Sequence, residues 1–201
     1  TCTIKVIAPT TREVKEYEVD GVSYGKGIVI GDVIWAPVNC GYEPSTSDSK
    51  GYPYGKLYQW GRKYGQGYNG PIYDTEGNKL GQYSDAELPV IETGPVSLDE
   101  GQLKTNADKF YYNSSIYQSD WCTPQDETLW NKGTASEPIK TEFDPCPSGW
   151  RVPTLDELSE LSENYSSWSI YENQNGFWFS GRTSYAADAL QVFLPAAGKR
   201  F

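Results

Sequence analysis

The chain has 201 residues, enough for one large domain or for one domain with a small addition, and its 20 glycines and 13 prolines indicate many turns rather than a helical bundle. Its formal net charge of -10 argues against nucleic acid and anionic lipid as partners. Histidine is absent, which excludes catalytic triads and metal sites that depend on it.

The first part of the chain predicts short strands. Residues 1–8 alternate polar and apolar side chains, as a strand with one buried face does, and Val14, Tyr17 and Val19 suggest a second strand. We expect residues 1–27 to be either the end of a preceding domain or a small added sheet. The main domain then spans residues 28–201. It opens with a predicted hairpin over residues 28–35, which turns at a Gly-Asp dipeptide.

The middle of the chain is rich in glycine, tyrosine and polar residues, which is typical of long loops. Residues 41–56 and 63–108 fit this description, and the intervening segment 56–62 supplies apolar side chains to the core. Residues 74–78 resemble a calcium loop only faintly and lack its spacing, so a simple turn is predicted there. Residues 126–131 predict one helical turn.

The last third predicts one amphipathic helix followed by strands. Thr154 is a suitable cap, and Glu157 completes a capping box for a helix over residues 154–163. Three leucines share one face at helical spacing and are expected to be buried: Leu155, Leu158 and Leu161. Three strands are then predicted over residues 167–171, 176–180 and 189–195, with a turn at 173–176 between the first two.

The four cysteines are far apart in sequence, at Cys2, Cys40, Cys122 and Cys146. No C-x-x-C pair occurs, so disulfides in an oxidising compartment are favoured over metal or redox chemistry. Four cysteines allow three connectivities, and the residues alone do not choose among them. Cys2 lies where a lipid-anchor cysteine could stand, but the strand predicted around it favours a structural role. No apolar run is long enough to span a membrane.

Residues 144–154 carry the most distinctive motif. Two prolines hold Cys146 in extended chain, Gly149 permits a turn, and Trp150 has a large apolar surface to bury. This stretch resembles the signature of the Fibrobacter succinogenes major paralogous (FISUMP) domain. Three further stretches match the family in the expected order, at residues 35–42, 54–62 and 193–200.

The resemblance implies an α+β, C-type-lectin-like fold with a twisted, mainly antiparallel sheet, few short helices and long ordered loops. It brings no established catalytic residue. It also implies a bacterial cell-surface protein of the Bacteroides type, either anchored to the outer membrane or carried by a fimbria.

FISUMP domains continue beyond the last matching stretch, so the resemblance implies that the main domain is incomplete at its C-terminal end. A strand from a neighbouring subunit or from further chain could then cover the sheet edge. The family partner of Cys146 lies in that further stretch. We therefore expect either a Cys122–Cys146 bridge or a free Cys146.

A dense aromatic cluster is the candidate ligand site: Tyr111, Tyr112, Tyr117 and Trp121. Flat rings beside Asn113 suit stacking on a sugar or docking against a protein, and we expect some of them around a shallow groove. The alternative is that these rings are core. Trp35, Trp60 and Trp150 are expected in the core, and Arg151 is expected to pair with a carboxylate.

These observations favour an extracellular, non-enzymatic domain for ligand recognition or adhesion, with a glycan or a protein as its ligand. One alternative is a structural subunit of a surface assembly that binds no free ligand. A polysaccharide-active enzyme is the third interpretation, because a glycosidase needs only two carboxylates. No cofactor and no metal ion are expected.

Overall fold

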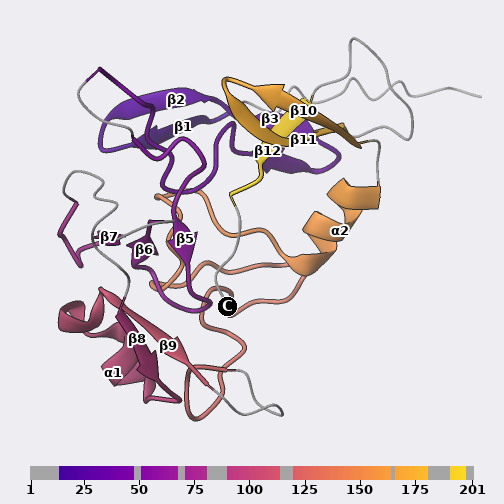
Figure 1. Ribbon diagram of the computed structural model, residues 1–201. Coiled ribbons are helices and arrows are strands. Elements are labelled where there is room, and N and C mark those ends of the chain that lie inside the picture. Colours follow the sequence, from indigo (N-terminus) through magenta and orange to yellow (C-terminus); the bar gives the residue numbers. More distant parts are fainter. Residues whose placement is uncertain are drawn as a thin grey trace, which may run out of the picture.

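The computed structural model describes residues 14–47, 51–67, 71–80, 90–113, 120–163, 166–180 and 191–197. Within these ranges the chain forms five small sheets, two short α-helices and one 3-10 helix (Figure 1). Four of these sheets are antiparallel, and the fifth is a two-stranded parallel pair. The predicted α+β class, with mainly antiparallel strands and few short helices, is confirmed.

One group of sheets lies at the top of Figure 1. Two hairpins come first: β1 (Glu16–Val19) with β2 (Val22–Lys26), and β3 (Ile28–Ile30) with β4 (Val33–Trp35). The third sheet has the order β10-β11-β12 and consists of β10 (Ser166–Tyr171), β11 (Gln174–Ser180) and β12 (Gln191–Pro195). The hairpin predicted over residues 28–35 and the last three predicted strands are therefore present.

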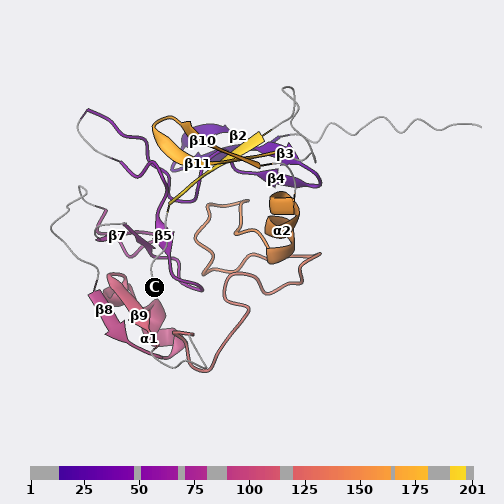
Figure 2. The same cartoon turned by 45° about the vertical axis from the view of Figure 1, so that its right-hand side comes forward.

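A second group of elements lies lower in both ribbon views (Figures 1 and 2). One sheet is made of β5 (Leu57–Tyr58), β6 (Gly65–Gln66) and β7 (Pro71–Tyr73). The parallel pair is β8 (Val90–Thr93) with β9 (Lys109–Tyr112), and α1 (Leu98–Gln102) and the 3-10 helix η1 (Lys104–Asn106) connect its strands. The sequence predicted only loops over most of this region.

Residues 120–154 cross between the two groups without a helix or a strand. The helical turn predicted over residues 126–131 is wrong, because the chain makes turns and bends there. The Asp126 carboxylate accepts hydrogen bonds from the backbone N–H of Thr128 at 2.8 Å and from its hydroxyl at 2.6 Å. Such a side-chain bond offers the backbone an alternative to the helix.

Helix α2 (Leu155–Glu163) begins with the predicted capping box. The Thr154 N–H donates to Glu157 Oε2 at 2.8 Å, and the Glu157 N–H donates to Thr154 Oγ1 at 3.3 Å. The predicted burial of the leucine face is only partly correct. Leu161 is 2% exposed, whereas Leu155 is 78% and Leu158 is 40% exposed. The helix reaches the sheets only with its last turns, so its first turns project beyond them.

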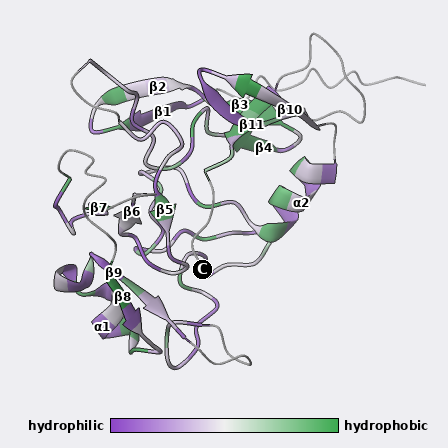
Figure 3. Cartoon of the chain, viewed as in Figure 1, coloured by the Kyte–Doolittle hydropathy of each residue, from purple (hydrophilic) through white to green (hydrophobic). Residues whose placement is uncertain are grey.

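The upper core is formed where α2 meets two of the sheets. Its buried members are Ile30, Trp35, Leu161 and Val192, and four half-buried residues pack against them: Ile28, Val33, Phe179 and Leu194. Figure 3 shows these hydrophobic stretches on β3, β4 and β11 and a band on α2. Trp35 is therefore in the core, as predicted.

The lower core is organised by a buried arginine. Arg62 is 1% exposed, and its guanidinium donates to three main-chain carbonyl oxygens, at 2.8 Å (Gly101), 2.5 Å (Lys109) and 2.7 Å (Asn106). It also lies over the rings of Tyr64, Tyr111 and Trp121. Trp60 is 40% exposed, contrary to the prediction that it is core, because its ring packs edge-to-face against Trp130, with ring centroids 4.9 Å apart, and is not enclosed in the lower core.

The β10–β11 hairpin turns earlier than predicted. Glu172 and Asn173 both have positive φ, at 48° and 63°, and Tyr171 pairs with Gln174. This two-residue turn matches the twist of the strands, so β11 begins two residues before the expected start at Gly176.

Some predictions lie outside the described residues: the strand at 1–8, Cys2, Tyr117 and the end of the chain beyond residue 197. The boundary at residue 27 stays a prediction. Within the described part of the chain, no helix combines the length and the apolar character needed to cross a membrane.

Candidate functional site

A cleft of about 650 Å³ lies between the upper sheets and the loop 144–153. The four stretches that carry the family resemblance all contribute to its lining, through most of residues 35–40, Lys56 with Tyr58, most of residues 145–153, and Leu194. Other parts of the chain add Tyr17, residues 32–34, Trp130, Glu157 and Leu158. Segments far apart in sequence therefore meet at one surface.

Asp144 holds the loop that forms one wall of the cleft. Its carboxylate is fully buried and accepts from the N–H of Cys146 at 2.8 Å and from the N–H of Val152 at 2.9 Å. The Lys140 ammonium donates to the same carboxylate at 2.7 Å and to the Cys146 carbonyl oxygen at 2.7 Å. The proline-rich loop therefore has a fixed shape although it contains no helix or strand.

A turn within this loop aims Trp150 across the cleft. The Trp150 N–H donates to the Pro147 carbonyl oxygen at 3.0 Å, and Gly149 has a φ of 79°, which favours glycine. The Trp150 ring meets the ring of Tyr17 edge-to-face, with centroids 5.3 Å apart. It also lies so close to Gly27 that a side chain there would collide with it.

Arg151 and Glu157 form the predicted ion pair at the rim. Arg151 donates from both terminal nitrogens to the two carboxylate oxygens, at 2.7 and 2.6 Å. This bidentate contact is the main reason why the pKa of Glu157 is lowered and the pKa of Arg151 is raised. Because Glu157 also belongs to the capping box, the pair ties the loop to the start of α2.

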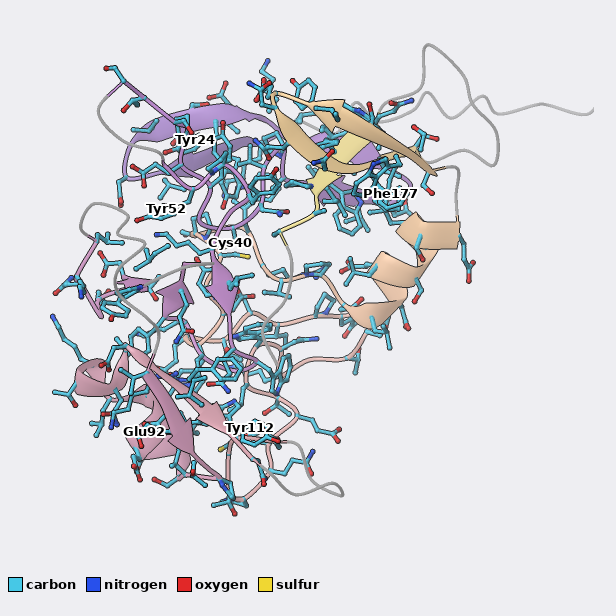
Figure 4. The ribbon with its side chains drawn as sticks, viewed as in Figure 1. Tyr24, Cys40, Tyr52, Glu92, Tyr112 and Phe177 are labelled. Carbon is cyan, nitrogen blue, oxygen red and sulfur yellow. The ribbon has the colours of Figure 1, made fainter. Side chains whose placement is uncertain are left out.

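The opposite wall is the segment that ends at Cys40. The Asn39 amide donates to the Tyr54 carbonyl oxygen at 3.1 Å, and the Lys56 N–H donates to the Cys40 carbonyl oxygen at 3.1 Å. Cys40 Sγ lies 3.5 Å from the Tyr58 hydroxyl. Figure 4 shows Cys40 at the level where the upper and lower groups of elements meet.

Several titratable groups at the cleft have shifted pKa values. Burial disfavours the charged form of a side chain. It is therefore the main reason why the pKa values of Tyr17 and Tyr58 are raised and the pKa of Lys56 is lowered. Shifted groups that gather at a cleft are typical of functional sites. Among the described residues, no group of three or more histidine, cysteine, aspartate or glutamate side chains could hold a metal ion.

The predicted aromatic site is divided between core and surface. Tyr111 and Trp121 are each 3% exposed and stack on one another in the lower core, with ring centroids 6.1 Å apart. Their ring faces are therefore not available to a ligand, which corrects the prediction for these two residues. Tyr112 is 50% exposed and points away from that core (Figure 4). Tyr117 lies outside the described residues.

The described cysteines are free thiols and fall into two places. Cys122 is buried in the lower core with Tyr111, Trp121 and Leu129. Cys40 and Cys146 are both half-buried and line the cleft. Of the two predicted outcomes for Cys146, the structure has the free thiol and not the Cys122–Cys146 bridge.

Sequence reasoning missed the cleft as a site, because it assigned Trp150, which is only half-buried, to the core and looked for the ligand elsewhere. The available signal was the set of four ordered stretches, which were read as marks of the fold alone. Comparison of the chain with known protein families, with curated proteins and with solved structures found no match.

Proposed function

We propose that this chain is an extracellular, non-enzymatic recognition domain of a bacterial surface or fimbrial protein, and that its cleft binds a carbohydrate. The observation that carries the proposal is the meeting of four separate stretches of the chain at one cleft. The volume of about 650 Å³ is in the range of small-molecule sites. A C-type-lectin-like fold and membership of the FISUMP family are parts of the same proposal.

The lining of the cleft supports a carbohydrate as the ligand. Sugars combine apolar ring faces with hydroxyl groups, and aromatic rings such as Trp130 and Trp150 suit the former. The indole N–H groups of both tryptophans are buried and meet no acceptor among the described residues. These nitrogens have almost no accessible surface, so it is the aromatic ring surfaces of the lining that suit a sugar.

The charges at the cleft argue for a neutral sugar over a strongly acidic one. Arg151 is neutralised by Glu157, and Asp32 also lines the cleft. Lys56 is the remaining cationic side chain in the lining, and burial lowers its pKa. A single cation of this kind does not offset the net charge of -10 on the chain.

A glycan array tests the proposal. We expect specific retention of one class of glycan by the wild-type chain, and its loss in Leu158→Arg, which places a long charged side chain at the cleft. Leu155→Arg is the matched control, because Leu155 is 78% exposed on the same helix and does not line the cleft. Retention that both variants preserve, or no retention by the wild type, contradicts the proposal.

A second candidate is a structural subunit that joins an assembly without a free ligand. The observation in its favour is an exposed apolar face on β10 and β11. Trp168, Ile170 and Phe177 are 55%, 69% and 40% exposed, and the rings of Trp168 and Phe177 meet edge-to-face with centroids 4.9 Å apart. Figure 4 labels Phe177 on this sheet. Among the described strands β10 has only one neighbour, β11. Self-association that Ile170→Lys abolishes, together with an empty glycan array, favours this candidate.

A further inference from the structure

We propose that Cys40 and Cys146 are a disulfide-forming pair, and that their bridge fastens the two walls of the cleft to each other. The proposal goes beyond ligand recognition, because the bridge forms whether or not the cleft binds a sugar. It concerns this one pair and leaves Cys122 as a free thiol.

The geometry places the Cys40 sulfur against the backbone of its partner. Cys40 Sγ donates to the Pro145 carbonyl oxygen at 3.3 Å, and that carbonyl belongs to the peptide group that joins Pro145 to Cys146. The two thiols are also near enough to shift each other's pKa values. Both side chains line the same cleft, so a small disulfide reagent can reach them.

Cys122 is not an alternative partner in this arrangement. It lies in the lower core, 3% exposed, and its sulfur contacts the Pro124 carbonyl oxygen at 3.5 Å. Asp144 meanwhile fixes the backbone N–H of Cys146 at 2.8 Å, and Lys140 holds its carbonyl oxygen. The loop therefore presents Cys146 to Cys40 rather than to Cys122.

The groups around the two cysteines decide which sulfur attacks the oxidant first. The hydrogen bond from Cys146 is the largest cause that lowers the pKa of Cys40, and Tyr58 and Lys56 act in the same direction. The same hydrogen bond, together with burial, raises the pKa of Cys146. The Tyr58 hydroxyl lies 3.5 Å from Cys40 Sγ and Lys56 lines the same cleft, so a thiolate at Cys40 has hydrogen-bond donors beside it; Cys40 attacks first, and Cys146 then completes the bridge.

The oxidant is a disulfide of low molecular weight or the disulfide of an exchange protein. The Cys40 thiolate attacks one oxidant sulfur, forms a mixed disulfide and releases the other sulfur as a thiol. Cys146 then loses its proton, attacks Cys40 Sγ and releases the second oxidant thiol. The two cysteines lose two electrons and two protons in total, and the oxidant disulfide is reduced to two thiols.

The bridge closes a long loop, since Cys40 and Pro145 are already 105 positions apart. Loops of this length restrict the unfolded chain strongly when they are closed. In the folded state the bridge connects the segment that carries Trp35 to the loop that carries Trp150. The width of the cleft is thereby fixed at its base.

The test is to incubate the reduced chain with glutathione disulfide, block the free thiols and map the peptides without reduction. We expect a cross-linked pair of peptides that contain Cys40 and Cys146, with Cys122 blocked. The same cross-link is expected in Cys122→Ser, while Cys40→Ser leaves Cys146 open to the blocking reagent. A bridge from Cys146 to Cys122 or Cys2, or blocking of both Cys40 and Cys146 after oxidation, overturns the proposal.

A melting experiment keeps the proposal testable if Cys40→Ser folds poorly. Addition of a reductant to the oxidised chain is expected to lower the melting temperature by about 10 °C in the wild type and in Cys122→Ser. No such shift is expected in Cys146→Ser. Equal melting of the oxidised and reduced wild-type chain contradicts a bridge across the cleft.

Discussion

Replacement of Asp144 with asparagine tests whether one buried carboxylate shapes the cleft wall. The carboxylate accepts from two main-chain N–H groups, of Cys146 and Val152, and from the Lys140 ammonium. An amide of the same size has one acceptor oxygen instead of two, so one buried N–H loses its partner. That loss costs about 1–3 kcal/mol, and the weaker bond to the remaining N–H adds about 1 kcal/mol.

Lys140 adds little to this sum, because its side chain is 30% exposed and can turn to water. We therefore expect Asp144→Asn to lower the free energy of unfolding by about 3 kcal/mol, which lowers the melting temperature of a chain of this size by about 6–12 °C.

Differential scanning calorimetry measures this shift. Glu142→Gln is the matched control, because it removes an exposed carboxylate two residues away and is expected to change the free energy of unfolding by less than about 0.5 kcal/mol. Equal melting temperatures for Asp144→Asn and Glu142→Gln would refute the role of Asp144 in the loop.

Three more predictions concern stability. Because the folded-state pKa of Glu157 is lowered, its ion pair stabilises the chain above the unfolded pKa of about 4.3, and this contribution disappears as the pH falls through the folded pKa. Thermal melts should therefore show the wild-type advantage over Glu157→Gln shrinking from about pH 6 to about pH 3, and a constant advantage speaks against the pair. Leu161→Ala should cost about 2–4 kcal/mol in urea denaturation, whereas Leu155→Ala should cost less than about 0.5 kcal/mol, and similar costs would contradict the placement of α2. Arg62→Lys should cost about 2–3 kcal/mol, because a single ammonium nitrogen cannot reach the three carbonyl oxygens that the guanidinium reaches from three separate nitrogens, and an unchanged denaturation midpoint would show that the guanidinium group is dispensable.

Local patterns in the sequence were enough to predict the elements that depend on near neighbours. The capping box of Thr154 and Glu157 predicted α2, and short runs of apolar residues next to turn residues predicted the β3–β4 hairpin and the strands of the last sheet. The same reasoning failed for Leu155 and Leu158. Helical spacing shows which side chains share a face, but it does not show how far that face is covered.

The features that the sequence did not predict depend on contacts between segments that are far apart in the chain. Arg62 gave no sign of burial, since arginine is mostly exposed and its partners here are main-chain carbonyl oxygens. The parallel β8–β9 pair and the cleft depend in the same way on segments brought together only by the fold. The neighbourhood of Cys40 and Cys146, more than 100 residues apart in sequence, was beyond what spacing could reveal.

The central claim is that the cleft binds a carbohydrate, and calorimetric titration with the best glycan from an array tests it most directly. The wild type and Leu155→Arg should bind that glycan with equal affinity, because Leu155 lies outside the cleft lining. Leu158→Arg should bind at least about tenfold more weakly, which corresponds to about 1.4 kcal/mol. Equal affinities of all three proteins would contradict the claim and place any binding elsewhere on the molecule.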